Sequence, residues 1–127
     1  MKRLLLSLIF IFVASAFATN LAFAQSSLSS ISKSLKSGDA STLSQYFDNS
    51  LELIILDDED SYSKTEARSK VQSFFQSNSP RSFVMKHQGS APNGSKYIIG
   101  TLTTSSGSFR TYIVVKNNRI QELSFED

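Results

Sequence analysis

The sequence predicts an α+β fold in which short helices pack on one face of an antiparallel β-sheet. Residues 97–116 contain two apolar, β-branched runs joined by the turn-forming stretch Thr104–Ser108, which is the pattern of a β-hairpin. Residues 63–75 combine a helix-capping sequence with apolar residues at helical spacing. The predicted order along the chain is therefore helix, helix, strand, helix and then four strands.

The N-terminus has the pattern of a secretory signal peptide. Lys2 and Arg3 precede an apolar run over residues 4–18, and Ala22-Phe23-Ala24 is a small-x-small cleavage sequence. We expect a signal peptide over residues 1–24, with cleavage after Ala24. Cleavage after Ala18 and retention as an anchor are alternatives, although a spanning helix needs roughly 20 apolar residues.

Residues 25–127 then form a single small domain. Without Lys2 and Arg3 the basic residues fall from 13 to 11 and balance the 11 acidic ones, so no basic field favours nucleic acid. The chain has no cysteine, which excludes disulfides, thiolate chemistry and a lipid-bearing cysteine after the signal. We expect an exported protein, periplasmic or secreted, that does not associate with the membrane after cleavage.

Two short helices are predicted at the start of the domain. The first covers residues 25–37 and ends at Gly38, which suits a helix C-cap. The second starts at Asp39, whose carboxylate can cap backbone N–H groups, and ends at residues 48–49. The apolar residues at helical spacing are Leu28, Ile31 and Leu35 in the first helix and Leu43, Tyr46 and Phe47 in the second.

The first strand is predicted over residues 51–56, which are too short and too β-branched for a helix. The acidic residues 57–60 end it. Calcium is a possible ligand there, but the spaced carboxylates and the later glutamate of a calcium loop are absent. A solvated connection is the favoured interpretation.

The third helix is the strongest helix prediction. Ser63 can cap it, and Glu66 can reach back to the cap. Asn78 and Pro80 end it. The face that we expect to enter the core consists of Ala67, Val71, Phe74 and Phe75.

Four strands complete the sheet as a meander over residues 82–88, 97–103, 109–116 and 119–125. Residues 89–94 are a loop, and Asn117-Asn118 is a two-residue turn, because Asn tolerates positive φ. Gly100 within a strand indicates a bulge or a bend of the sheet.

Side-chain alternation assigns these strands two partly apolar faces. The first face is predicted to carry Phe83, Met85, His87, Tyr97, Ile99, Thr101, Thr111, Ile113, Val115, Ile120, Glu122 and Ser124. The second is predicted to carry Val84, Lys86, Ile98, Gly100, Leu102, Arg110, Tyr112, Val114, Leu123 and Phe125. Because three short helices cover only one face, the other is either a dimer surface or part of a sheet that curls on itself.

The element order resembles the nuclear transport factor 2-like superfamily, in which helices and a bent sheet form a cystatin-like cone with a pocket. The chain also resembles a secreted bacterial family known as domain of unknown function 4783. The similar stretches are residues 43–56, 62–63, 74–75, 83, 87–89, 96–104 and 107–115. The resemblance implies the cone fold and an exported location, and it implies no activity.

The leading functional hypothesis is a non-enzymatic domain that binds a small apolar ligand or a partner protein in or beside the cone. The pocket residues predicted for this role are Phe47, Phe74, Phe83, Met85, His87, Tyr97 and Ile99. The first alternative is a structural protein that forms a homodimer through its sheet. The residues predicted for that dimer face are Tyr112, Val114, Leu123 and Phe125.

An isomerase- or hydratase-type enzyme is the third possibility, because the superfamily includes ketosteroid isomerases. His87 is the single histidine and a possible acid–base group on the same predicted face as Tyr97. Glu122 is the acid on that face, two strands from Tyr97. With one histidine and no cysteine we expect no metal site, and no motif indicates a cofactor.

Overall fold

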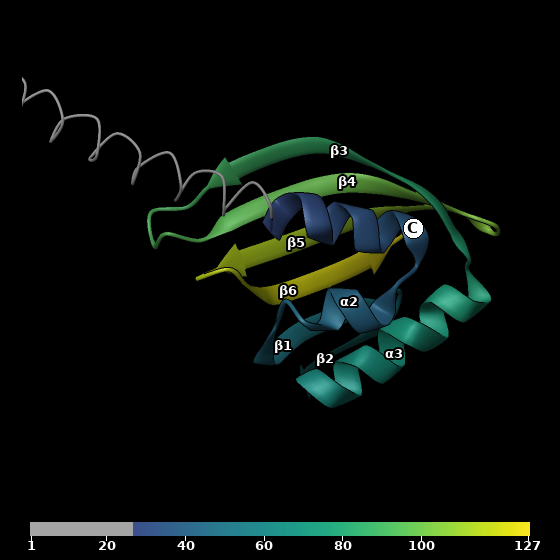
Figure 1. Ribbon diagram of the computed structural model, residues 1–127, viewed down its shortest axis with the longest axis horizontal. Helices are drawn as coiled ribbons and strands as arrows, with labels where there is room; N and C mark the ends of the chain where they lie inside the picture. The colour runs from purple at the N-terminus through teal and green to yellow at the C-terminus, as the bar shows by residue number, and fades with distance from the viewer. Residues whose placement is uncertain (1–26) are drawn as a thin grey trace, which may run out of the picture.

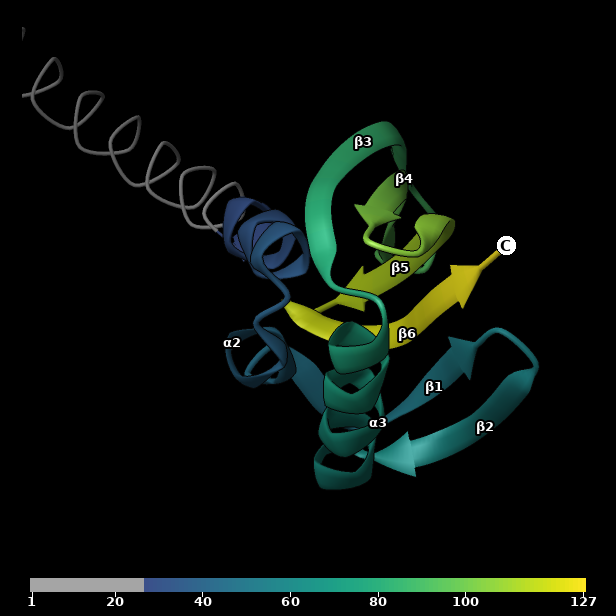
Figure 2. The same cartoon turned by 90° about the vertical axis from the view of Figure 1, so that its right-hand side faces the viewer.

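The computed structural model describes residues 27–127 and has three helices on one side of a six-stranded sheet (Figures 1 and 2). The predicted signal peptide, residues 1–24, lies outside the described residues. The helices cover residues 27–37, α2 Ala40–Ser44 and α3 Lys64–Ser77. The strands are β1 Phe47–Ile55, β2 Asp58–Ser63, β3 Pro80–Ser90, β4 Lys96–Thr104, β5 Gly107–Lys116 and β6 Arg119–Glu126.

The strand order is β2-β1-β6-β5-β4-β3. Strands β3 to β6 form the predicted antiparallel meander. Strand β1 pairs in parallel with β6, so the sheet is mixed rather than wholly antiparallel. The α+β class and the cone-type order are confirmed, with β2 as one further strand before α3.

Predicted caps fix the helix ends. Gly38 has φ of 69°, the left-handed conformation of a C-cap. The Thr42 backbone N–H donates to the Asp39 carboxylate over 3.0 Å, and the Glu66 backbone N–H donates to Ser63 Oγ over 3.2 Å. The sequence therefore determines where α2 and α3 begin.

The core lies between the helices and one face of the sheet. Phe74 is its centre: its ring stacks on Phe125 at a centroid distance of 4.7 Å and meets Phe109 edge-on at 5.1 Å. The second ring of α3, Phe75, also packs edge-on against Phe125 at 5.9 Å. Four phenylalanines thus join α3 to β5 and β6.

Two local predictions are wrong. The second helix ends at Ser44 rather than at residues 48–49, and Phe47 already begins β1. Residues 58–63 are a strand, not a solvated connection. Apart from Tyr62, which packs against the core, the residues of β2 are polar or charged. This suits an edge strand, because charged side chains protect such an edge from pairing with another chain.

Each of the two predicted faces contains residues from both faces of the actual sheet, because the predicted register is wrong at three places. The turn between β4 and β5 has two residues, so that Thr104 pairs with Gly107 and every side chain of β5 is inverted relative to the prediction. An irregularity in the β3–β4 pairing between Met85 and His87 places Phe83 and Met85 on the opposite face from His87. A second irregularity lies in the β5–β6 pairing between Val114 and Val115.

Among residues 27–127, no helix is long and apolar enough to cross a membrane.

Candidate functional site

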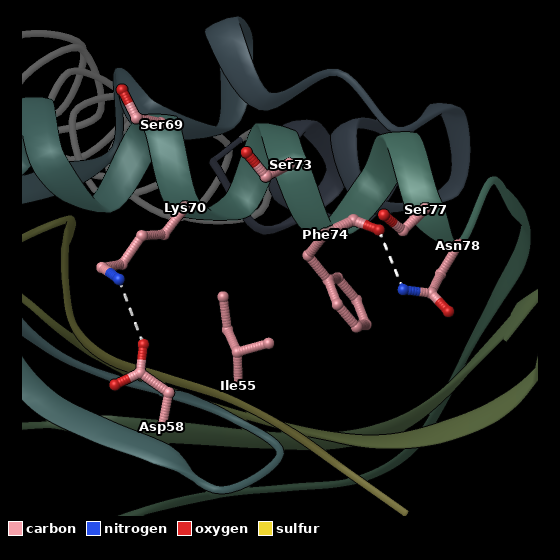
Figure 3. A pocket seen from close by; sticks show the side chains of 8 residues that line it. All are labelled: Ile55, Asp58, Ser69, Lys70, Ser73, Phe74, Ser77 and Asn78. Atoms are coloured by element: carbon pink, nitrogen blue, oxygen red, sulfur yellow. Dashed lines mark hydrogen bonds and ion pairs between the residues drawn. The ribbon is translucent and has the colours of Figure 1, made fainter.

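An open groove of about 440 Å³ lies between α3 and the β1–β2 hairpin (Figure 3). Helix α3 forms one wall, and the end of β1 with the start of β2 forms the other. Ile55 and Phe74 approach each other from the two walls, between an ion pair at one end and Asn78 at the other. The groove therefore combines an apolar centre with polar ends.

A compact polar cluster closes the first end. Lys70 Nζ lies 3.2 Å from Asp58 Oδ2, and the Tyr62 hydroxyl donates to the two Asp58 oxygens over 2.9 and 3.1 Å. Lys70 Nζ also lies 4.7 Å from the Tyr62 ring centroid, which is a cation–π contact. Strand β2 supplies Asp58 and Tyr62, and α3 supplies Lys70, so the cluster depends on the packing of α3 over β2.

The hydrogen bonds of this cluster shift the pKa values of its three side chains. The bond from the Tyr62 hydroxyl, followed by that from Lys70, lowers the pKa of Asp58. The bond to Asp58 raises the pKa of Tyr62, and the same carboxylate raises the pKa of Lys70. All three pKa values move away from neutrality, so Asp58 is ionised while Tyr62 and Lys70 keep their protons.

The other end is tied to the turn between β4 and β5. Asn78 Nδ2 donates to the Phe74 carbonyl over 3.0 Å, and Ser106 Oγ donates to Asn78 Oδ1. The Ser105 backbone N–H also donates to the Ser79 carbonyl over 2.9 Å. These bonds fix the Asn78 amide at the mouth of the groove.

Three serines on α3 line the helix side of the groove: Ser69, Ser73 and Ser77. They are four residues apart, so their positions repeat about every 6 Å along the helix. Their side chains are exposed and form no hydrogen bond within residues 27–127. The hydroxyls are therefore free to bind a molecule from solvent.

The structure does not bring the seven predicted pocket residues together. Phe47 and Phe74 are buried in the core, and Phe83 packs at its edge. Tyr97, Ile99 and His87 lie on the opposite face of the sheet, as the β3–β4 and β4–β5 pairings show. Met85 is 37% exposed beside the irregular pairing. Of the seven, Phe74 alone lines the groove.

The predicted dimer face is also divided. Leu123 and Phe125 are fully buried in the core beneath the helices. Tyr112 and Val114 are half-buried on the opposite face, where they pair with Ile99 and Tyr97. The inverted β5 register explains the division.

His87 and Glu122 share that opposite face with Tyr97, as predicted. Glu122 lies two strands from Tyr97, with Val114 between them. Burial, followed by the nearby Glu52, Glu59 and Glu126, raises the pKa of Glu122. His87 lines a separate groove with Lys86 and Arg110, and no hydrogen bond joins it to Tyr97 or Glu122 in the described chain.

The sequence analysis did not identify Asp58 and Lys70 as residues of a functional site. Asp58 was assigned to a solvated connection, because β2 has no apolar run to indicate a strand. The alternation of Asp58, Asp60 and Tyr62 was an available signal, since it places these three side chains on one face of a strand. No group of three or more potential metal ligands occurs among residues 27–127.

Comparisons with known proteins identify related folds. The family model described as "Domain of unknown function (DUF4783)" matches residues 28–126. A DUF4783 family protein from Bacteroides fragilis is 27% identical, with a TM-score of 0.72 over 77% of this chain and 95% of that chain. No curated protein matches the sequence.

More distant structures have the same architecture. An uncharacterized cystatin fold protein from Novosphingobium aromaticivorans is 10% identical, with a TM-score of 0.55 over 79% of this chain and 94% of that chain. The protein Rd1NTF2_04 "with long sheet" is 15% identical, with a TM-score of 0.64 over 80% of this chain and 98% of that chain. These likenesses confirm the predicted cystatin-like and nuclear transport factor 2-like fold.

Proposed function

The chain belongs to the DUF4783 family, and from this premise we propose that it is an exported, non-enzymatic domain that binds a small amphipathic molecule in the groove between α3 and β1–β2. The observation that carries the proposal is the composition of this groove. Its volume of about 440 Å³ is within the range of ligand pockets, and it joins an apolar centre to polar ends. The export pattern of residues 1–24 supports the location.

The contacts indicate how such a molecule would lie. Its apolar part would cover Phe74 and Ile55, and its polar part would face Lys70 or the free serine hydroxyls. The cone interior is filled by the stacked phenylalanines, so the molecule would lie in the groove rather than deep inside. A mixed ligand therefore fits better than the purely apolar one that the sequence predicted.

The protonation states favour binding over catalysis. A general acid or base works best with a pKa near the working pH. The hydrogen bonds among Asp58, Tyr62 and Lys70 move each pKa away from neutrality. We therefore do not propose an isomerase or hydratase reaction in this groove.

The fluorescent probe 1-anilino-8-naphthalenesulfonate tests the groove, because its rings match the apolar centre and its sulfonate matches Lys70. We expect Ser73→Trp, which fills the groove from α3, to weaken binding of the probe about tenfold, a loss of about 1.4 kcal/mol. The matched control is Gln76→Trp, on the same helix but outside the groove. Equal affinity in the two variants would contradict the proposal.

A second candidate function is self-association through the sheet, the alternative that the sequence predicted. It uses a different surface, the face of the sheet opposite the helices. The observation that favours it is the group of half-buried apolar residues on that face, including Tyr112 and Val114.

A further inference from the structure

A second groove, of about 420 Å³, lies on the face of the sheet opposite the helices, over β3, β4 and β5. Five polar side chains line it: Lys86, His87, Thr101, Ser108 and Arg110. No residue lines both this groove and the one beside α3. A ligand bound here would therefore be independent of the one proposed above.

An irregularity of β3 accounts for one side of this groove. Successive side chains of a regular strand point to opposite faces, so Lys86 and His87 would normally be separated. The pairing with β4 passes from Met85 directly to His87, which leaves Lys86 without a partner in the ladder. An extra residue of this kind bends the strand and re-aims its side chains. Both side chains consequently line one groove.

Strands β4 and β5 supply the other side. Thr101 and Arg110 are direct partners across these strands, so their side chains share a face. Ser108 is two residues before Arg110 and lies on the same face. Ile99, the partner of His87, adds a half-buried apolar side chain. The groove therefore combines two hydroxyls, a guanidinium and an apolar surface with the two side chains from β3.

The charge of this groove is positive and unbalanced. No acidic residue lines it, whereas Lys86 and Arg110 each carry a positive charge. None of its five polar side chains forms a hydrogen bond or an ion pair within residues 27–127. A cleft lined by charges of one sign attracts ions of the opposite sign. The groove is therefore suited to an anion.

The strand register places one acidic residue beside the groove. Glu126 lies opposite Arg110 across β5 and β6. Its carboxylate accepts a hydrogen bond from Ser124 Oγ over 3.1 Å and forms no ion pair with Arg110. The Arg110 guanidinium therefore keeps its N–H donors available for a ligand.

These groups match the chemistry of a phosphate monoester. An arginine side chain can donate two parallel hydrogen bonds to phosphate oxygens, and hydroxyl, ammonium and imidazole N–H groups can donate to the others. A phosphate monoester carries a charge of about −1.5 to −2 at pH 7, which two cations balance, whereas a carboxylate carries a single charge. The volume of about 420 Å³ is in the range of ligand pockets, so it leaves room for the group that carries the phosphate.

We propose that this groove binds a molecule that carries a phosphate monoester. Lys86 and Arg110 balance its charge, and Thr101, Ser108 and His87 donate hydrogen bonds to its oxygens. The proposal goes beyond the proposed function, and it depends neither on the groove beside α3 nor on self-association.

Titration with phenyl phosphate, followed by nuclear magnetic resonance of the backbone amides, measures both the affinity and the place of binding. Phenyl phosphate supplies the monoester, and its ring matches the apolar surface of Ile99. Phenyl sulfate is the matched ligand, because it has the same ring and a single negative charge. We expect phenyl phosphate to bind at least about tenfold more tightly than phenyl sulfate, and to shift the amide signals of the residues that line this groove.

Two double variants of equal net charge test the named residues. Lys86→Gln with Arg110→Gln removes both charges of the groove and should weaken binding of phenyl phosphate at least about tenfold. The matched control is Lys96→Gln with Lys116→Gln, outside the groove; all four residues are exposed, so both variants should fold. Equal affinity of the two variants would overturn the proposal, because binding would then follow net charge alone. Signal changes around Lys70 instead would also overturn it and would place the phosphate beside α3.

A phosphate monoester can be free in solution or belong to a lipid headgroup. Co-sedimentation with phosphatidylcholine vesicles, with and without phosphatidic acid, distinguishes the two sources, because the phosphatidic acid headgroup is a phosphate monoester. The form that binds the wild type but not the Lys86–Arg110 variant supports the proposal and identifies the source. Binding to neither phenyl phosphate nor these vesicles would overturn the proposal and would leave the groove beside α3 unaffected.

Discussion

The two faces of the sheet differ in how their apolar residues are used. On the helix side, Leu123 and Phe125 are completely buried, and the phenylalanines of α3 stack on them. On the face of the sheet opposite the helices, here called the open face, Tyr112 and Val114 are only half-buried, although they come from the adjoining strand. The same alternating sequence therefore supplies both a sealed core and an incomplete surface.

This contrast separates stability from interaction. Buried aromatic side chains stabilise the fold through the area removed from water and through ring contacts. Half-buried side chains with unpaired charges around them contribute less to the monomer and can gain more from a partner. We therefore expect substitutions on the helix side to change folding, and those on the open face to change association.

The largest expected effect is that of Phe125→Ala. The Phe125 side chain is 0% exposed and touches both Phe74 and Phe75, so we expect a loss of about 3–5 kcal/mol in the free energy of unfolding. Chemical denaturation of dilute protein measures it. The matched substitution on the open face, Tyr112→Ala, should cost about 1 kcal/mol. Equal losses would mean that the two faces do not differ as described.

The next effect is smaller and concerns Gly100, which pairs with Met85 where β3 and β4 lie side by side. A Cβ atom on Gly100 would lie 2.6 Å from Phe83 Cζ and 2.7 Å from the Val84 carbonyl oxygen. Because the carbonyl belongs to the paired strand and cannot turn away, we expect Gly100→Ala to destabilise the fold by about 1–3 kcal/mol. Thermal or chemical unfolding measures this change.

A double variant distinguishes the ring contact from the backbone contact. Phe83→Ala removes the ring, so Gly100→Ala should cost less in that background, and the two losses should not be additive. The residual cost in the double variant reports the contact with the Val84 carbonyl. Full additivity would show that the Phe83 ring moves aside in the single variant, contrary to the expectation.

Sequence reasoning succeeded where a local signal pointed to specific residues, and it failed where several neighbouring residues carried the same signal. The Asn117-Asn118 turn was predicted correctly, and both residues adopt the expected positive φ, 53° and 60°. The other hairpin was predicted with a five-residue connection, because Thr104–Ser108 contains several turn-forming residues and no signal that selects two of them. That local ambiguity inverted β5 and divided the predicted sites.

The candidate groove was less predictable than the fold for a related reason. Phe74 was identified because helical spacing places it on the apolar face of α3. The Asp58–Lys70 ion pair requires the packing of an edge strand under α3, and no apolar period marks that strand. Local patterns located the helix caps and the Asn117-Asn118 turn, whereas a site formed by contacts between distant segments follows only from their packing.

The smallest expected effect tests the charges of the open face in the monomer. Burial and neighbouring glutamates raise the pKa of Glu122 in the folded protein, so folding favours its protonated form. Stability is therefore lost as the pH rises from the unfolded-state pKa through the folded-state pKa. The loss is absent at lower pH, where Glu122 is protonated in both states.

Glu122→Gln should remove this penalty. Because solvent screens the partly exposed site, we expect a gain of about 0.5 kcal/mol at neutral pH, and no gain in acid below the unfolded-state pKa. Denaturant unfolding at both pH values, at a concentration where the wild type is monomeric, measures the difference. A gain of the same size at both pH values would assign it to packing rather than to the charge of Glu122.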